Sequence, residues 1–215
     1  MHSEVLVVAH PDRLPRLEYR GGIAARSTLP DTVHLLSALA TPFGGDTINV
    51  RVVVEPRARL VLRSVSAKLV LPDGDATTSH SHFELEVAGS LDLDLEPTVV
   101  AANSRHLASL TLQVSDGGRI RLRERVQIGR CNESGQGFWS DSLRADVCDR
   151  PLVRHHVEMG AGETVSDATL RPARAYIGEL RYPANVVGWP PHATATVLEL
   201  PAGGVLTTWR GDRLA

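Results

Sequence analysis

Apolar and polar residues alternate along much of the chain, most clearly between Arg119 and Ile128. One side of this segment carries Ile120, Leu122, Val126 and Ile128, and the other carries Arg119, Arg121, Arg123, Arg125 and Gln127. Glu124 interrupts the apolar side. A period of two predicts a β-strand with one buried and one solvated face. The same period recurs over residues 83–87, 91–95, 143–147 and 194–198.

Turn-forming sequences separate these alternating segments. They are Gly44-Gly45-Asp46, Pro72-Asp73-Gly74-Asp75 and Ser115-Asp116-Gly117-Gly118, and glycine and aspartate favour tight turns. Valine, isoleucine and threonine, which favour strands, are plentiful. We therefore predict an all-β, helix-poor protein with few short helices. It forms a single β domain over residues 1–215, with a layered or helical arrangement of its sheets.

Three segments fit this pattern less well. Residues 31–39 fit either a short helix capped by Asp31 or an alternating strand. Residues 161–175 are rich in small side chains but carry little apolar stripe. Proline and glycine are frequent after Arg181, so residues 181–215 are expected to be partly irregular. The sequence shows no internal repeat.

Composition narrows the classes of partner. The chain has 23 basic and 25 acidic residues and a net charge of −2, which gives no electrostatic footprint for nucleic acid or an anionic membrane. Its apolar runs are shorter than the roughly 18 residues of a membrane-spanning helix, and its first residues do not resemble a signal peptide. We expect a cytoplasmic protein. Whether Cys131 and Cys148 pair is left open.

The motifs of common catalytic classes are missing. The chain contains no G-x-S-x-G, H-E-x-x-H or G-x-G-x-x-G sequence. Lys68 is the only lysine, and no glycine run precedes it, so a phosphate-binding P-loop is excluded. The sequence therefore predicts a protein that is not an enzyme.

Two groups of side chains have the spacing of metal ligands. His80 and His82 fall on one face of a strand, although exposed histidines are commoner than metal sites. Asp92, Asp94 and Glu96 also alternate on one face. This acidic row fits a solvated sheet face, and it also fits a polar channel or a site for a hard cation.

Several segments, taken in order, resemble the urease accessory protein D family, UreD (also called UreH). The resemblance covers roughly residues 21–160. Its segments are Val33-His34-Leu35-Leu36, Phe43-Gly44-Gly45-Asp46, residues 58–62 and 66–68, Leu93-Asp94-Leu95-Glu96-Pro97, Gly129-Arg130 and Gly135-Gln136-Gly137-Phe138. Many members of the family have glutamate where this chain has Gln136, and Glu133 lies nearby.

The resemblance implies a non-catalytic maturation factor with an all-β fold. Such proteins bind apo-urease and the urease accessory protein F, which recruits the GTPase urease accessory protein G. Together they deliver Ni²⁺ to urease, and the ion is thought to pass through a polar tunnel in the D protein. Nickel would then be a transient, weakly bound cargo of this chain, with no organic cofactor.

The same resemblance points to particular residues. Asp46, Asp94, Glu96 and Glu133 are the candidate contacts of a transient nickel path. Asp46 also fits a purely turn-forming role, because aspartate after two glycines readily caps a turn. The candidate structural or interface residues are Gly44, Gly45, Gly129, Arg130 and Phe138. The row of arginines from Arg119 to Arg125 fits either a plain solvated face or a surface for an acidic partner.

A β-sandwich module that binds carbohydrate or peptide is the main alternative. Aromatic residues make up only 4% of the chain, whereas sugar-binding platforms usually need stacked aromatic faces. Trp139, Trp189 and Trp209 are too dispersed in the sequence to indicate one platform. This alternative has no metal role.

Overall fold

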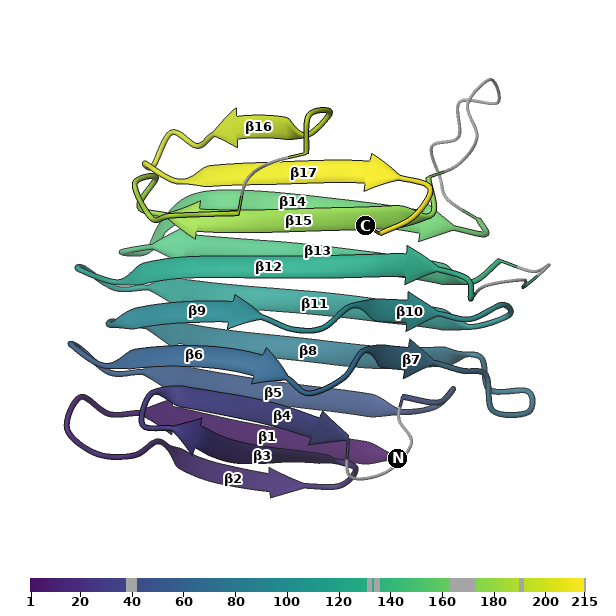
Figure 1. Cartoon of the computed structure of the whole chain (residues 1–215), viewed down its shortest axis with the longest axis horizontal. Coiled ribbons are helices and arrows are strands. Elements are labelled where there is room, and N and C mark those ends of the chain that lie inside the picture. Colours follow the sequence, from purple (N-terminus) through teal and green to yellow (C-terminus); the bar gives the residue numbers. More distant parts are fainter. Residues whose placement is uncertain (38–41, 131–132, 134–135, 163–172, 190–191, 215) are drawn as a thin grey trace.

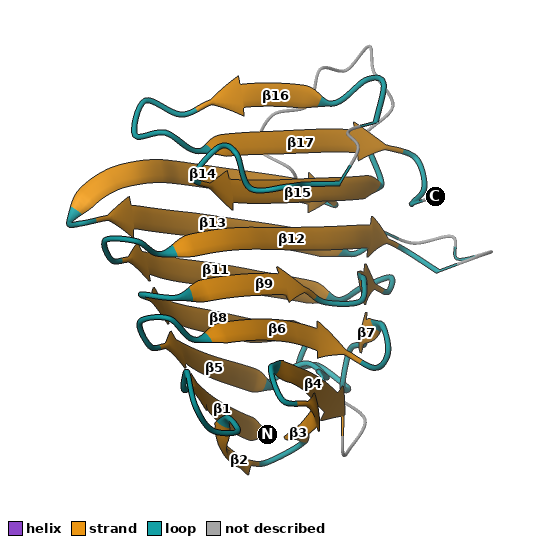
Figure 2. Ribbon diagram, turned by 60° about the vertical axis from the view of Figure 1, so that its left-hand side comes forward, coloured by secondary structure: helices purple, strands orange, loops and turns teal. Residues whose placement is uncertain are grey.

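The protein is described by a computed structural model that covers residues 1–37, 42–130, 133, 136–162, 173–189 and 192–214. These residues form two facing β-sheets and contain no helix (Figures 1 and 2). None of their elements could therefore cross a bilayer as an apolar helix. The prediction of an all-β, helix-poor protein is confirmed.

The first sheet has seven strands in the order β14-β13-β11-β8-β5-β1-β2. Their bounds are β1 (His2–Ala9), β2 (Arg16–Arg20), β5 (Thr47–Val54), β8 (Thr78–Val87), β11 (Arg105–Val114), β13 (Phe138–Val147) and β14 (Arg150–Gly160). Neighbours from β1 through β5, β8 and β11 to β13 run parallel.

The second sheet has ten strands, eight of them in the order β16-β17-β15-β12-β9-β6-β4-β3. Their bounds are β3 (Ile23–Leu29), β4 (Thr32–Ser37), β6 (Arg59–Ser64), β9 (Ser90–Asp94), β12 (Arg119–Ile128), β15 (Ala175–Tyr182), β16 (Thr196–Glu199) and β17 (Val205–Gly211). The short strands β7 (Lys68–Val70) and β10 (Thr98–Val100) pair with each other, and β10 also pairs with β12.

The middle of the molecule is a solenoid. The chain passes from β5 to β6, from β8 to β9 and from β11 to β12, so each coil contributes a strand to both sheets (Figure 1). The crossover between sheets allows successive strands of one sheet to be parallel. Antiparallel strands close both ends of the stack. The coils repeat in structure although the sequence shows no repeat.

Inward-facing side chains fill the space between the sheets. The buried apolar residues come from alternate positions of facing strands and form one large cluster and one smaller cluster around Trp139. The turns that join the sheets also stack on one another, because Ser90 N donates to Ala58 O at 2.9 Å and Arg119 N donates to Gly89 O at 2.8 Å. A Cβ at Gly89 would lie 2.2 Å from Ala58 O, so only glycine fits there.

The second sheet is interrupted in two neighbouring coils. Strand β6 ends at Ser64 and β7 begins at Lys68, and the next coil leaves the same gap between β9 and β10 (Figure 1). The gap is spanned by a hydrogen bond from Glu96 N to Ser64 Oγ, 2.9 Å. At this break, residues 65–67 and 95–97 do not belong to strands of the sheet.

The segments that the sequence leaves ambiguous are now assigned where the structure describes them. Residues 32–37 form strand β4, so the strand interpretation of residues 31–39 holds for this part. Most of residues 161–175 lie outside the described residues. The C-terminal part contains the regular strands β16 and β17, whose hairpin extends the second sheet.

Candidate functional site

A cavity of about 80 Å³ lies between the two sheets, which is room for a few water molecules. Its wall is largely apolar, but ionisable residues also line it. They include Lys68 (β7), His106 (β11), Glu124 (β12), Asp141 (β13) and Tyr176 (β15), which come from five strands. The interior of the solenoid therefore contains charge-bearing groups from strands far apart in the sequence.

Strand register explains why these groups meet. In the first sheet Ala108 pairs with Ser81 on one side and with Asp141 on the other, so the two positions on the β8 side of Asp141 carry small side chains. In the second sheet Lys68, Thr98, Val126 and Tyr176 form one row. Small residues opposite large polar ones leave the space that the cavity occupies.

Gly178 contributes to the same space. It pairs with Glu124 across β12 and β15, and it has no side chain to cover the carboxyl. A Cβ at this position would lie 2.5 Å from the Tyr176 hydroxyl. The glycine thus lets the tyrosine ring and Glu124 share one corner of the cavity.

Lys68 and Glu124 both line the cavity, and both residues are partly buried. Among the described residues, neither side chain forms a hydrogen bond. Burial and the neighbouring Asp141 charge raise the pKa of Glu124 well above its usual value, and Lys68 opposes this. Burial lowers the pKa of Lys68, against the pull of both carboxylates.

Asp141 is also a buried ionisable group with a shifted pKa. Burial raises its pKa to about 7, because the carboxylate has little access to water. Only 7% of the residue is exposed. The ionisation of Asp141 is therefore shifted toward neutral pH.

His106 is held as a neutral imidazole. Its Nδ1 hydrogen-bonds to Ser79 Oγ at 2.9 Å and its Nε2 to Ser81 Oγ at 3.0 Å. Burial lowers its pKa well below the usual value, and the positive charge of Lys68 adds to this. With both nitrogens engaged, His106 contributes to the fold of the wall more than to binding in the cavity.

A second cavity of about 70 Å³ adjoins the first. Five residues line both cavities and so form the neck between them: Lys68, Phe83, Leu95, Glu96 and Thr98. The second cavity also reaches the exposed residues Ser37 and Ser66. Glu96 and Ser66 both lie in the break of the second sheet, where the side chain of Glu96 is 48% exposed. The break is therefore the place where the cavities meet the surface.

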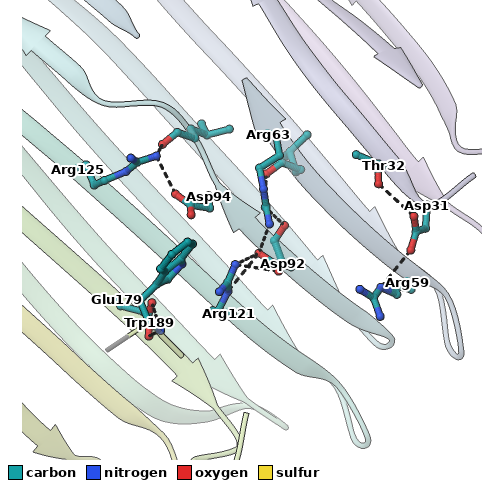
Figure 3. A network of polar contacts seen from close by, with 12 residues as sticks. Asp31, Thr32, Arg59, Arg63, Asp92, Asp94, Arg121, Arg125, Glu179 and Trp189 are labelled. Atoms are coloured by element: carbon teal, nitrogen blue, oxygen red, sulfur yellow. Dashed lines mark hydrogen bonds and ion pairs between the residues drawn. The ribbon is translucent and has the colours of Figure 1, made fainter. Parts of the chain in front are cut away.

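Paired charges cover the outer face of the second sheet beside this opening (Figure 3). Asp92 accepts from Arg121 at 2.8 Å and from Arg63 at 2.9 Å. Asp94, only 7% exposed, accepts from Arg125 at 3.1 Å. Two arginines of the row, Arg121 and Arg125, therefore bind carboxylates of their own chain, and the role of the row in binding an acidic partner stays a prediction.

Trp189 lies over the same face. Arg123 Cζ is 4.6 Å from the centroid of its ring, and Arg121 Cζ is 5.5 Å away. The backbone N–H of Trp189 donates to both Glu179 carboxylate oxygens at 3.3 Å (Figure 3). Trp139, by contrast, is fully buried. Trp189 and Trp209 line one small pocket together with His192, so the three tryptophans do not share a single platform.

Asp46 belongs to the turn before β5. Its Oδ2 accepts from Phe43 N at 2.8 Å, and its own N–H donates to Phe43 O at 3.0 Å. Gly45 has a φ of +84°, which favours glycine. Gly44 is needed for a different reason, because a Cβ there would lie 1.7 Å from Ala76 O. The Gly-Gly-Asp sequence thus builds this turn, and a role of Asp46 in a nickel path stays a prediction.

Glu133 holds a second turn. Its Oε2 accepts from Ala102 N at 3.0 Å and from Arg130 N at 2.9 Å, and its Oε1 accepts from Arg130 Nη2 at 2.8 Å. Burial opposes ionisation, but these hydrogen bonds outweigh it and lower the pKa of Glu133. Nearby Gly129 has a φ of +77°. Arg130 therefore anchors a carboxylate of its own chain.

The remaining predicted positions have separate surroundings. Phe138 is buried under the Arg105 guanidinium, whose Cζ lies 4.0 Å from the ring centroid. Gln136 lies among the described residues, whereas Cys131 and Gly135 lie outside them. Cys148 is an exposed free cysteine. The rings of His80 and His82 stack 6.2 Å apart on β8. Within the described part of the chain, no three potential ligands are grouped as a metal site.

The structure thus brings together residues that sequence reasoning did not combine. Of the predicted nickel contacts, Glu96 lies at the neck and Asp94 beside the opening, while Asp46 and Glu133 each hold a turn. Glu124 carries the one sequence signal for the interior group, since it interrupts an apolar row. Asp141 precedes the alternating segment 143–147 on its buried face, which is a weaker signal of the same kind.

The architecture places the protein in a class: a two-sheet β-solenoid with an ionisable cavity that opens through a break in one sheet. Comparison with known sequences identifies the family. The family profile of the UreD urease accessory protein matches residues 12–211. The chain therefore belongs to the UreD family, as its motifs indicate.

Curated relatives agree with this assignment. The chain is 41% identical over 134 residues to a urease accessory protein UreD of Frankia alni, which covers 60% of this chain and 45% of the relative. It is 30% identical over 190 residues to urease accessory protein UreD 1 of Saccharopolyspora erythraea, covering 86% and 69%. The chain spans about half the length of the curated relatives it matches.

Proposed function

We propose that this chain is a non-catalytic urease maturation factor that passes Ni²⁺ through its interior. It docks on apo-urease and on the accessory proteins F and G in the cytoplasm, and it releases the ion toward the urease active site. The observation that carries the proposal is the cavity between the sheets, found in a chain of the UreD family. Glu124 and Asp141 supply oxygen ligands inside it.

The chemistry of the cavity suits a cargo that must be released. Nickel accepts imidazole and oxygen ligands, and the residues that line the cavity include Glu124, Asp141 and His155. A closed set of four ligands would hold the ion too tightly to let it leave. Burial keeps Glu124 and Asp141 protonated more readily than exposed carboxyls, so an entering cation must displace protons, which weakens its binding further.

The two predicted residues near the opening extend this route. Glu96 reaches solvent and also lines both cavities. Asp94 is held by Arg125, so its charge is already balanced. We therefore assign the entry of the ion to Glu96 and keep Asp94 as a residue that shapes the opening.

The test is a co-purification with activity readout. The tagged chain is co-expressed with apo-urease and the F and G proteins, and the eluate is assayed for each partner, bound nickel and urease activity. Glu124→Gln and Asp141→Asn keep side-chain volume and remove the charge that a cation needs. We expect both variants to assemble normally and to lower urease activation at least tenfold.

Glu84→Gln is the matched control, because Glu84 is exposed on the outer face of β8. It should leave both assembly and activation unchanged. Absence of any complex with folded partners would refute the docking role. Full activation by the Glu124 and Asp141 variants would refute passage through this cavity.

A further inference from the structure

Lys68 occupies an unusual position for the only lysine of the chain. It lies directly after the break in the second sheet, and it lines the inner and the outer cavity at once. Its amide is fixed, because Lys68 N donates to Pro97 O at 2.9 Å. Its side chain has no hydrogen-bond partner among the described residues. The backbone is thus anchored at the neck while the ammonium is not.

The charge of Lys68 shifts the pKa values of other ionisable groups that line the inner cavity. It favours the ionised forms of Glu124 and Asp141 and disfavours the protonated form of His106. Lys68 is therefore a positive charge that acts on both interior carboxyls. A divalent cation that moves from the opening toward them meets this charge first, in a region of low dielectric where repulsion is strong.

We propose that Lys68 is the gate of the cavity: its ammonium blocks the neck to cations and balances the interior carboxyls until a divalent cation displaces it toward the outer cavity. The inference deepens the proposed function and rests on it for the identity of the cargo. The gate itself is a property of the isolated chain. Without a bound cation, the Lys68 ammonium offsets the charge of the interior carboxylates. With a bound cation, the lysine side chain is displaced toward the outer cavity.

The first test measures Ni²⁺ binding to the isolated chain by calorimetry, with Ni²⁺ alone as the probe. Lys68→Met keeps the length and apolar stem of the side chain and removes its charge. We expect this variant to bind Ni²⁺ at least tenfold more tightly than the unaltered chain. Lys68→Arg keeps the charge and should bind no more tightly than the unaltered chain. Equal affinity of the methionine variant and the unaltered chain would overturn the gate, as would absence of binding in every variant.

The second test needs no substitution at Lys68. Since no other side chain carries a primary amine, mass spectrometry can follow reductive methylation of Lys68 alone in a peptide that contains it. We expect Ni²⁺ to accelerate this modification several-fold, because displacement brings the amine toward the opening. Glu124→Gln is the control, and Ni²⁺ should have less effect there. An unchanged rate in the unaltered chain would overturn the proposal.

The two hypotheses fail in different ways. Gated binding by the isolated chain, together with no activation of urease in the co-purification, leaves the gate standing and refutes the maturation role. Activation of urease with unchanged nickel affinity in Lys68→Met refutes the gate and leaves the maturation role standing.

Discussion

Asp141 is a single interior residue that makes the stability of the folded protein depend on pH. Its carboxyl has a pKa of about 7 in the folded protein, whereas an aspartate in the unfolded chain titrates near pH 3.9. The folded state thus binds more protons between these values. The stability that this group contributes is fully present below the lower pKa and is lost as pH rises through the upper one.

The substitution Asp141→Asn should remove this dependence. Relative to the unaltered chain, we expect the free energy of unfolding of the variant to improve by a few kcal/mol as pH rises from about 4 to about 7. Denaturant unfolding across this range measures it. Asp116→Asn, in an exposed turn, is the control and should run parallel to the unaltered chain. A parallel profile for Asp141→Asn would show that the carboxyl is ordinarily solvated.

At the scale of an element, the turns between the sheets set how closely the coils approach. Ala88 and Gly89 join β8 to β9, and the preceding turn places Ala58 O and Glu55 O against Gly89. Backbone atoms cannot move aside as a flexible side chain can. The spacing of the coils therefore depends on a missing Cβ.

Gly89→Ala should accordingly destabilise the protein by about 2–4 kcal/mol, through overpacking against the neighbouring turn. Ala88→Ser changes the adjacent residue by one atom and should cost less than about 1 kcal/mol. Thermal unfolding of both variants provides the comparison. Similar melting temperatures for the two would mean that the turns can separate without penalty.

The alternation of apolar and polar residues predicts individual strands and their faces, but it does not predict how the strands pair. The segment from Arg119 to Ile128 is a strand with the predicted faces, because period two is a local property. The partners of Arg121 and Arg125 are Asp92 and Asp94 in the preceding coil. Such pairs depend on register between strands about thirty residues apart, and no sequence repeat reveals that register.

The candidate site could be predicted only in part, because its residues also come together through the pairing of strands. A charged residue on an apolar face, such as Glu124, can be recognised as an interruption. Its meeting with Lys68 and Asp141 cannot, since those residues approach through a parallel stack and across the two sheets. Small neighbours such as Ala108 matter only because register places them beside Asp141. The cavity exists because small side chains leave space between the strands, and the sequence does not show which small side chains become neighbours.

For the whole molecule, the solenoid makes stability depend on neighbours. Strands β5, β8 and β11 each have a hydrogen-bonded partner on both sides, whereas β16 is an edge strand with every residue exposed. Each coil is stabilised mainly by the coils that it contacts. Stability should therefore fall from the middle of the stack toward its ends.

Amide hydrogen exchange can test this gradient. We expect the slowest exchange in β5, β8 and β11 and the fastest in β2 and β16, because edge strands open without unfolding the core. Uniform protection across all strands would indicate that the two ends unfold only together with the middle. That result would contradict nearest-neighbour stabilisation.

The interior position of the lone lysine also decides which tools can map this protein in an assembly. Amine-directed cross-linkers, the usual choice for locating subunit contacts, find only one lysine, which is partly buried and lines the cavities. The outer sheet face instead offers carboxylates and guanidinium groups (Figure 3). Cross-linking mass spectrometry of a complex with urease must therefore target acidic residues, and a lysine cross-link would report on the passage inside the solenoid.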